Sequence, residues 1–399
     1  MKIVIAPDSF KENLTSLQVG KAIEKGIRRV LPKARVEIVP MADGGEGTVQ
    51  SLVDATGGKI VRKKVTGPMG TSISARYGML GDGATAVIEM AEASGLPLVP
   101  REERDPLQAT TFGTGELLLD AIKRGAKSII IGLGGSATVD GGIGMAQALG
   151  VRFLDQRGKA IAPHAGGGAL EKVAAIDVSQ VAPGLRKTRV IVACDVDNPL
   201  CGRKGAAHVF GPQKGASPAL VKKLDAGLKN FGAVIRKDLK KDVLKLAGAG
   251  AAGGLGAGLV AFTGARLKSG VDIVIEATGL AAHLKGADLV ITGEGRVDFQ
   301  TAFGKTPAGV AKTAHKQKIP VVAIGGGLAD DARGVFEHGI DALDAAAARD
   351  MSLEEAIRLS REHLANAGER VIRMIQIGQR MERQKARRVA ARKQRTIQK

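Results

Sequence analysis

The stretch ADLVITGEGRVDFQTAFGKTPAGVAKTAHKQKIPVVAI, from Ala287 to Ile324, decides the fold of this chain. It holds two short apolar runs, Ala287–Thr292 and Pro320–Ile324, with a helical pattern over Thr306–His315 between them. Two consecutive strands joined by a helix pair in parallel, because a tight turn can only join antiparallel strands. The stretch therefore predicts a β–α–β unit whose first strand leads into a polar, glycine-rich loop.

The same alternation occurs at the beginning of the chain and continues near its end. The expected elements are a strand over Lys2–Ala6, a helix over Ser16–Leu31, a strand over Arg35–Val39, a helix over Gly47–Ala55 and a closing helix over Leu353–Ile377. Together with the β–α–β unit, they predict a doubly wound α/β domain with a parallel sheet, of the Rossmann or flavodoxin-like kind, built from both chain ends.

The middle of the chain has a different pattern, with little helix between its first three strands. The expected strands are Lys59–Val65, Ser72–Met79, Thr85–Met90, Ser128–Gly132 and Arg189–Cys194. This pattern predicts a second α/β domain with a mixed sheet, inserted in the first. The expected division is residues 1–66 with 286–379 for the doubly wound domain, 67–285 for the inserted domain, and 380–399 for a basic tail that is disordered or a frayed helix.

The composition limits the kinds of partner. The 399 residues carry a formal net charge of +19, and residues 381–399 contain eight lysines and arginines against one glutamate. Such a balance suits anionic ligands, but aromatic residues make up only 3% of the chain, which argues against stacking on nucleic-acid bases. A nucleic-acid-binding tail stays open as an alternative, and the sequence leaves monomer and homodimer equally open.

Several other classes of protein lack support in the sequence. The chain shows neither a signal peptide nor a long uncharged apolar stretch, which predicts a cytoplasmic protein with no membrane partner. Cys194 and Cys201 form no CxxC pair, and the histidines show no zinc-site spacing. No G-x-S-x-G motif is present, so a serine hydrolase has little support.

A glycine-rich loop, GLGGSATVD, follows the expected strand at Ser128–Gly132. Backbone N–H groups exposed by glycines after a strand can hold an anion, helped by nearby hydroxyls. The alternative is a tight strand–helix turn capped by Asp140. The residues expected to form such an anion site are Gly132, Gly134, Gly135, Ser136 and Thr138.

Two further glycine patterns resemble nucleotide motifs only in part. Gly248–Gly253 fits G-x-G-x-x-G, but no clean strand precedes it, so a close backbone approach is the better interpretation. Gly304-Lys305-Thr306 ends like a P-loop, yet Phe299 occupies the position of that motif's first glycine.

Acidic residues follow four of the expected strands, where open α/β sheets bind their ligands. They are Asp8, Asp43 with Glu46, Asp195 with Asp197, and Glu294 with Asp298. Each alone could be a turn or cap residue, but together they predict an acid cluster that binds Mg²⁺ or accepts a proton. The loops also carry Lys11, Lys214 and Lys305, as charge stabilisation in phosphoryl transfer requires.

From Met1 to about Arg373 the chain resembles the bacterial-type glycerate kinase family. The resemblance rests on ten blocks in order: IAPDSFKENLTS, PMADGGEGT, VIEMAEASGL, TTFGTGELL, GLGGSATVDGGIGMAQALG, ACDVDNPLCG, VFGPQKGA, GAGAAGGLGAGL, LVITGEGRVDFQT and GKTPAGVA. It departs from the family at Val139, where Asn is frequent, and at Glu12-Asn13, where Gly-Ser is common.

The resemblance implies phosphoryl transfer from ATP to D-glycerate with Mg²⁺, giving 2-phosphoglycerate. A 3-phosphoglycerate product, or another small hydroxy acid as substrate, remains an alternative. It also implies two α/β domains, the smaller inserted in the larger, with the catalytic cleft between them. A non-catalytic anion- or nucleotide-binding protein is the rival from another class, because it would need the glycine loops without the acid cluster.

Loop position and chemistry, together with the resemblance, suggest a role for each residue. The expected catalytic residues are Asp195, Lys11, Asp43 and Lys305. The expected substrate ligands are Asp8, Ser9, Glu46, Asn198, Lys214, Glu294 and Asp298. The anion loop is expected to bind ATP, and Asp195 with Glu294 to bind the metal.

Overall fold

The computed structural model describes the backbone of residues 1–397 and the side chains of residues 1–390. It divides the chain into two compact units. Unit 1 comprises Met1–Pro40 and Gly279–Lys399, and unit 2 comprises Met41–Thr278. Within the described residues, no helix is both long and apolar enough to cross a membrane.

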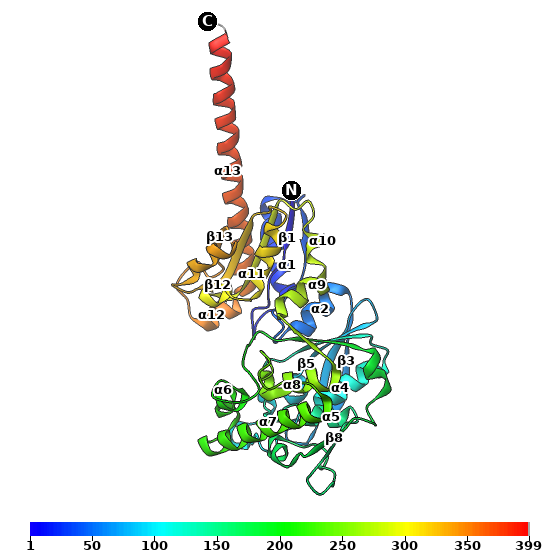
Figure 1. Cartoon of the computed structure of the whole chain (residues 1–399). Helices are drawn as coiled ribbons and strands as arrows, with labels where there is room; N and C mark the ends of the chain where they lie inside the picture. The colour runs from blue at the N-terminus through cyan, green and yellow to red at the C-terminus, as the bar shows by residue number, and fades with distance from the viewer. Residues whose placement is uncertain (398–399) are drawn as a thin grey trace. The chain divides into compact units, whose positions relative to one another are not determined.

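Unit 1 is built on a five-stranded, fully parallel sheet with the strand order β13-β12-β11-β1-β2 (Figure 1). The strands are β1 (Lys2–Ile5), β2 (Arg35–Ile38), β11 (Leu289–Val297), β12 (Val321–Leu328) and β13 (Ala342–Ala345). Strands from the two ends of the chain therefore pair directly, as the parallel sheet predicted from the sequence requires. β11 runs to Val297, five residues beyond the expected strand, so Glu294 lies within the strand and not in the following loop.

The helices of unit 1 are α1 (Ser16–Val30), α10 (Leu280–His283), α11 (Thr306–His315), α12 (Leu353–Arg358) and α13 (Ser360–Ile397), with 3-10 turns η6 (Phe299–Ala302) and η7 (Ala332–His338). α1 begins at a capping box, because the Thr15 hydroxyl accepts from the Gln18 backbone N–H while the Gln18 side chain accepts from the Thr15 N–H. Its buried face packs against α13, where a Cβ on Gly26 would lie 1.7 Å from the Ala365 carbonyl oxygen.

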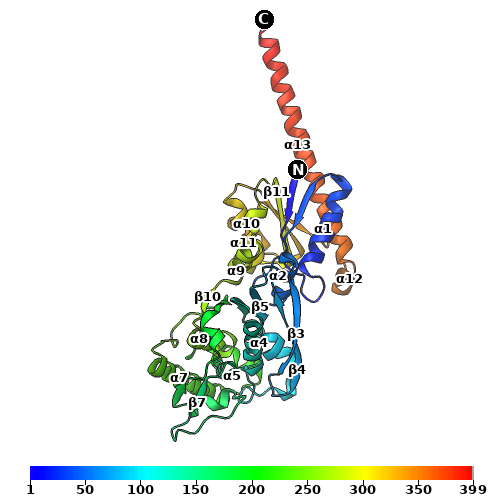
Figure 2. The ribbon, with the colours of Figure 1, turned by 90° about the vertical axis from the view of Figure 1, so that its right-hand side faces the viewer.

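The expected closing helix is divided and extended in the structure. The helical run breaks at Leu359, between α12 and α13, and α13 then continues well past Ile377. The expected tail at residues 380–399 is helical as far as Ile397, and residues 398 and 399 lie outside the described part. Figures 1 and 2 both show the second half of α13 extending away from the rest of unit 1.

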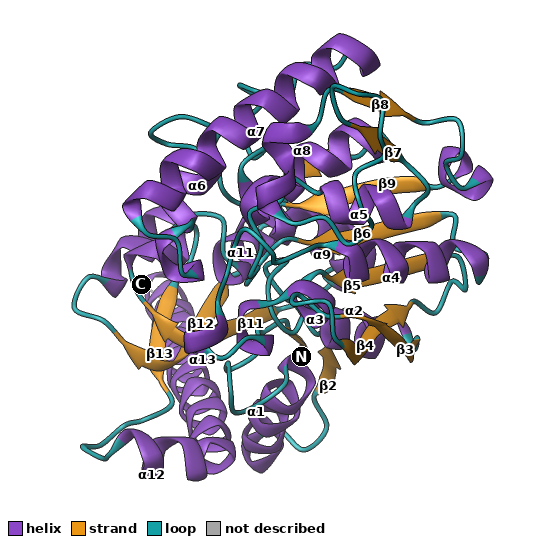
Figure 3. Cartoon of the chain, turned by 90° about the horizontal axis from the view of Figure 1, so that it is seen from below, coloured by secondary structure: helices purple, strands orange, loops and turns teal. Residues whose placement is uncertain are grey.

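Unit 2 contains a six-stranded mixed sheet with the order β10-β9-β6-β5-β4-β3 (Figure 3). Its strands are β3 (Lys59–Thr66), β4 (Ser72–Met79), β5 (Thr85–Glu89), β6 (Ser128–Gly132), β9 (Arg189–Ala193) and β10 (Arg266–Lys268); β7 (Arg152–Leu154) and β8 (Ala175–Asp177) form a separate pair. β3, β4 and β5 are antiparallel neighbours, whereas β5, β6, β9 and β10 are parallel. This confirms the mixed sheet expected for the middle of the chain.

Helices cover the sheet of unit 2 and contribute side chains to two buried hydrophobic clusters. They are α2 (Thr48–Thr56), α3 (Ala91–Ser94), α4 (Phe112–Lys123), α5 (Ile143–Ala148), α6 (Ala206–Phe210), α7 (Pro218–Leu239), α8 (Ala251–Thr263) and α9 (Gly270–Thr278), with 3-10 turns η1 (Leu96–Leu98), η2 (Arg101–Glu103), η3 (Gly167–Lys172), η4 (Pro183–Lys187) and η5 (Pro212–Lys214). In the register of the sheet, Glu89 of β5 lies beside Gly132 of β6, which lies beside Ala193 of β9. The loops that follow these three strands therefore start from one edge of the sheet.

The structure divides the chain earlier than the expected boundary at residue 66. β3 pairs with β4 along its whole length, from Lys59 opposite Met79 to Thr66 opposite Ser72. α2 packs against the same sheet, so the segment from residue 41 onward belongs to unit 2. At the other end the division falls after Thr278, because α9 packs against α2 and β9.

Candidate active site

In unit 2 the loop that precedes α2 crosses the end of the sheet. A Cβ on Gly132, at the end of β6, would lie 2.4 Å from the Gly44 carbonyl oxygen. A Cβ on Gly270, the first residue of α9, would lie 1.9 Å from the Asp43 carbonyl oxygen. Only glycine fits such close backbone approaches. The glycines thus hold Asp43 between the end of the sheet and the start of α9.

This packing brings Asp43 near Asp195, as the sequence-based acid cluster requires. Asp195 follows β9, and its Oδ1 accepts a hydrogen bond of 3.0 Å from the backbone N–H of Gly270. Although the residue as a whole is exposed, its carboxyl group lies against the start of α9. Burial of that group raises the pKa of Asp195, and the charges of Asp43 and Asp272 raise it further. The sequence analysis did not include Asp272 among the site residues. Its position in the first turn of α9 is the feature that could have identified it.

Lys214 lies beneath the glycine-rich loop. Its side chain is buried, and its Nζ donates to the Ser136 hydroxyl at 2.6 Å and to the Thr138 carbonyl oxygen at 2.7 Å. Burial lowers the pKa of Lys214 to about 7, while the charge of Asp140 acts in the opposite direction. Lys214 therefore points into unit 2, contrary to the expectation that it binds the substrate directly.

Asp140 ends the same loop and is fully buried. Its carboxylate accepts from the Thr111 backbone N–H and hydroxyl, at 2.8 and 2.7 Å, and from the Gly142 and Gly144 N–H groups, at 3.0 and 3.3 Å. Burial raises the pKa of Asp140. These bonds fit the alternative expectation of a capped turn, and they also fix the far end of the loop. Gly134 and Gly135, at its tip, are exposed.

The second glycine pattern, Gly248–Gly253, supports this loop from behind. A Cβ on Gly253 would lie 1.9 Å from the Thr138 carbonyl oxygen, and the Gly253 carbonyl accepts from the Gly141 N–H at 3.0 Å. Gly253 also has a left-handed backbone, with φ of +66°. This confirms the expected close backbone approach. Thr138 is fully buried, and its hydroxyl has no hydrogen-bond partner among the described residues.

Two expected substrate ligands of unit 2 have different surroundings. Glu46 is exposed just before α2. Asn198 holds its own loop, because its side-chain amide donates to the Lys204 backbone carbonyl at 2.8 Å and its backbone carbonyl accepts from the Gly250 N–H at 2.9 Å. The side chain of Asn198, expected to bind the substrate, thus already takes part in a turn.

Glu89, the last residue of β5, was missed by the sequence analysis. The residue is 8% exposed, and its Oε1 accepts a hydrogen bond of 2.8 Å from the Val49 N–H in the first turn of α2. Burial raises the pKa of Glu89 to about 7. Its position at the end of a strand could have identified Glu89, because Asp195 was predicted from its position directly after a strand.

In unit 1, Asp8 follows β1 and is buried. Its Oδ1 accepts from the Ser9 N–H at 2.6 Å, and its Oδ2 accepts from the Thr306 hydroxyl at 2.6 Å. The Asp8 N–H donates to the Gly293 carbonyl of β11 at 2.8 Å. Asp8 and Ser9 therefore lie beside β11 and the start of α11.

Lys305 precedes α11 and lies between two acids. Its Nζ is 3.6 Å from Glu294 Oε2 and 3.4 Å from Asp298 Oδ1. The Thr301 hydroxyl also donates to Glu294 Oε1 at 2.6 Å. In the structure this lysine therefore pairs with carboxylates of its own segment. Lys11, by contrast, is exposed.

The expected acids thus form two sets, one in each unit. The set in unit 1 is Asp8, Glu294 and Asp298, and the set in unit 2 is Asp43, Glu46, Asp195 and Asp197. The expectation that four strands present acids at one edge of a single sheet is wrong, because β1, β2 and β11 belong to the sheet of unit 1, whereas β9, which precedes Asp195, belongs to the sheet of unit 2.

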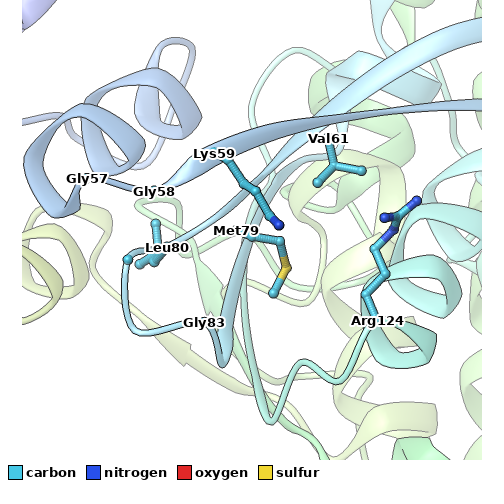
Figure 4. Close-up of a pocket in the computed structure, with 9 residues that line it drawn as sticks. Gly57, Gly58, Lys59, Val61, Met79, Leu80, Gly83 and Arg124 are labelled. Atoms are coloured by element: carbon cyan, nitrogen blue, oxygen red, sulfur yellow. The ribbon is translucent and has the colours of Figure 1, made fainter.

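A cavity of about 490 Å³ lies elsewhere in unit 2 (Figure 4). It is lined by residues at the start of β3, the end of β4 and the turn that follows, with Lys59 and Arg124 supplying its positive charge. None of the residues expected to bind ligands lines it. It therefore has no part in the candidate site.

The carboxylates were also tested as a metal site. Among the described residues, no group of three or more His, Cys, Asp or Glu side chains is arranged to hold a metal ion. Mg²⁺ in phosphoryl-transfer enzymes commonly takes only one or two carboxylates, with phosphate oxygens and water completing its shell. Asp195, whose pKa is raised by burial and by two neighbouring acids, fits such a role.

Comparison with known proteins adds a family. The sequence profile of the glycerate kinase family matches residues 3–376. The chain is 56% identical to a glycerate kinase of Halalkalibacterium halodurans over 89% of this chain and 93% of that one. It is 51% identical to a glycerate 2-kinase of Escherichia coli over 95% of this chain and 99% of the relative.

A solved structure agrees with these relatives. The crystal structure of a glycerate kinase 2 candidate from Salmonella typhimurium LT2 superposes with a TM-score of 0.88 at 49% identity, covering 95% of this chain and 99% of that one. Profile, sequence identity and three-dimensional structure therefore agree along nearly the whole chain, and the chain belongs to the glycerate kinase family.

Proposed function

We propose that this chain transfers the γ-phosphoryl group of ATP to the 2-hydroxyl of D-glycerate and releases 2-phosphoglycerate and ADP. Family membership across residues 3–376 is the observation that carries the proposal. The name of the Escherichia coli relative, glycerate 2-kinase, supports the 2-position. A 3-phosphoglycerate product, or another small hydroxy acid as substrate, is the alternative.

We assign the phosphate groups of ATP to the loop Gly132–Asp140. Its glycines expose backbone N–H groups after a strand, as anion-binding loops do. The buried ammonium of Lys214 beneath the loop adds positive potential, because its Nζ bonds to Ser136 and Thr138. This observation supports a cradle for a polyanion and gives Lys214 an indirect role.

We assign Asp195 as the group that accepts the proton of the reacting hydroxyl. In this transfer the O–H bond of glycerate breaks, its oxygen bonds to the γ-phosphorus, and ADP leaves with the bridging oxygen. A carboxylate whose pKa is raised accepts a proton more readily near neutral pH. Burial and the acids Asp43 and Asp272 raise the pKa of Asp195, and Asp43 would orient the same hydroxyl.

Mg²⁺, when bound, would neutralise charge on the β- and γ-phosphates of ATP. Binding of this Mg²⁺ is the alternative role of Asp195 to that of proton acceptor, and Asp195 fits it better than Glu294 does. Glu294 already pairs with the Lys305 ammonium at 3.6 Å, which leaves it less charge to offer a cation.

We propose that residues of unit 1 bind glycerate. Its carboxylate needs a cation, and Lys11 is an exposed lysine that could provide one. Asp8, Ser9 and Asp298 offer oxygens that suit its hydroxyls. We also propose that unit 2 is a domain inserted in unit 1, and that the protein acts in the cytoplasm, where its free cysteines stay reduced.

A rate assay tests the proposal. The purified chain would be mixed with ATP, Mg²⁺ and one of D-glycerate, L-glycerate, glycolate or lactate, and ADP release would be followed. The proposal predicts the highest kcat/KM with D-glycerate. Equal ADP release with and without any acceptor would instead favour a nucleotide-binding protein without kinase activity.

A further inference from the structure

We propose that Lys214 couples nucleotide binding to proton uptake, so that the loop Gly132–Asp140 binds phosphate groups with a protonated lysine beneath it. This inference rests on the proposed function, since it takes the loop to be the ATP phosphate site. It goes further by making Lys214 a positioning residue that never contacts the substrate and by giving ATP binding a defined pH dependence.

The geometry places Lys214 behind the loop and away from solvent. Only 2% of its surface is exposed, and its Nζ makes its two hydrogen bonds to Ser136 and Thr138, both within the loop. The loop tip at Gly134 and Gly135 is exposed. A phosphate bound at the tip would therefore contact the same loop that holds the Lys214 ammonium through Ser136 and Thr138.

The surroundings of Lys214 leave its charge poorly compensated. Asp140 is the acid whose charge acts on Lys214, but its carboxylate is already engaged by four hydrogen bonds from Thr111, Gly142 and Gly144. Arg104 also lies close, because its guanidinium donates to the Gln213 carbonyl at 3.1 Å. On α6, next to η5, His208 faces Asp225 at 4.0 Å.

The unliganded protein should therefore hold the Lys214 proton only in part at neutral pH. Burial lowers the pKa of Lys214 to about 7. A bound phosphate supplies the missing negative charge, which favours the ammonium form and raises that pKa. Binding then takes up about 0.1 proton at pH 6, where the lysine is already charged, and about 0.5 proton or more at pH 8.

The same linkage affects steady-state kinetics. Above pH 7, ATP must bind an enzyme whose Lys214 is increasingly neutral. KM for ATP should consequently rise between pH 7.5 and 9, by up to about tenfold per pH unit. A purely structural lysine would change KM or stability without producing this slope.

Titration calorimetry with Mg-ATP, in the absence of glycerate, tests the inference. Heats measured at each pH in buffers of different ionisation enthalpy give the number of protons taken up. The wild type is compared with Lys214→Met, which removes the charge, and Lys214→Arg, which keeps it permanently. Protons exchanged by ATP itself cancel in the difference between variants.

The matched control is Lys241→Met. Lys241 is a partly buried lysine whose Nζ donates to the Val260 and Ala261 carbonyls at 3.2 and 2.7 Å, and its pKa is also lowered by burial. These carbonyls belong to α8 and not to the loop. Lys241→Met should keep the wild-type proton uptake on ATP binding, whereas both variants of Lys214 should lose it.

Uptake at pH 8 in the wild type and in Lys241→Met, with none in Lys214→Met or Lys214→Arg, supports the inference. Equal uptake in the wild type and Lys214→Met overturns it, and if both Lys214 variants fail to fold, a flat dependence of the wild-type KM on pH overturns it as well. Phosphoglycerate formation by the wild type tests the proposed function separately, so the two can fail independently.

Discussion

Replacement of Glu89 by Gln should remove a pH-dependent loss of stability from unit 2. Glu89 is 8% exposed, and burial raises its pKa from 4.5 to about 7. Between these two pH values the folded state binds more protons at this site than the unfolded chain does. Stability therefore falls as pH rises through this window.

The magnitude follows from the pKa values. A difference of about 2.5 pKa units corresponds to about 3 kcal/mol at full titration. Between pH 5 and pH 8.5 the wild type should lose about 2 to 3 kcal/mol through this carboxyl group. The Gln side chain carries no titrating proton, and its amide oxygen can still accept from the Val49 N–H, so Glu89→Gln should not show this loss.

Urea unfolding followed by tyrosine fluorescence measures the effect in unit 2. The chain has one tyrosine and no tryptophan, and Tyr77 is buried in β4, next to β5, where its hydroxyl donates to Asp120. Other titrating groups contribute equally to both proteins and cancel in the difference. The advantage of Glu89→Gln over the wild type should grow by about 1 M in urea midpoint from pH 5 to pH 8.5. Parallel midpoints across this range would refute the reasoning.

Two further predictions concern the candidate site. Asp195→Asn should lower kcat about 100-fold or more, because it removes the proposed proton acceptor. Asp197→Asn changes an exposed acid of the same loop and should keep a kcat close to that of the wild type. Equal kcat values in the two variants would contradict the assignment. Gly253→Ala places a methyl group 1.9 Å from the Thr138 carbonyl oxygen at a φ of +66°, so it should cost about 3 kcal/mol in urea unfolding and raise KM for ATP. Wild-type stability in Gly253→Ala would contradict the close approach.

Local sequence patterns predicted the helices and strands well, because hydrophobic periodicity and capping residues mark where these elements lie. Thr306–His315 is helical with the bounds expected, and Ser128–Gly132 forms a strand with the bounds expected. The division of the chain was harder to predict. The apolar pattern of Lys59–Thr66 shows that it is a strand, but only its pairing with β4 shows which sheet it joins.

The candidate site shows the same limit. Position after a strand identified Asp43 and Asp195, and the structure brings both to the start of α9. The direction of a side chain does not follow from such a position. Lys214 lies in a glycine- and proline-rich loop that looks exposed in sequence, yet it points inward to hydrogen-bond acceptors that come from residues more than 70 positions away.

Glu12 illustrates how a departure from the family is accommodated. The resemblance noted in the sequence places glycine at this position, and the backbone of Glu12 takes a left-handed φ of 60°. The turn after Asp8 therefore keeps the conformation that glycine favours, at the cost of about 1 kcal/mol of local strain. The sequence shows the residue, but only the backbone angle shows that this position favours glycine.

Phosphorus NMR of the reaction mixture tests the central claim most directly. The chain would be incubated with ATP, Mg²⁺ and D-glycerate, and the product phosphomonoester would be recorded without proton decoupling. The proposed function predicts loss of the γ-phosphate signal and a new doublet, because phosphorus on the 2-oxygen couples to a single proton. A triplet would place the phosphate on the 3-oxygen, and the absence of any glycerate-dependent phosphomonoester would contradict the account.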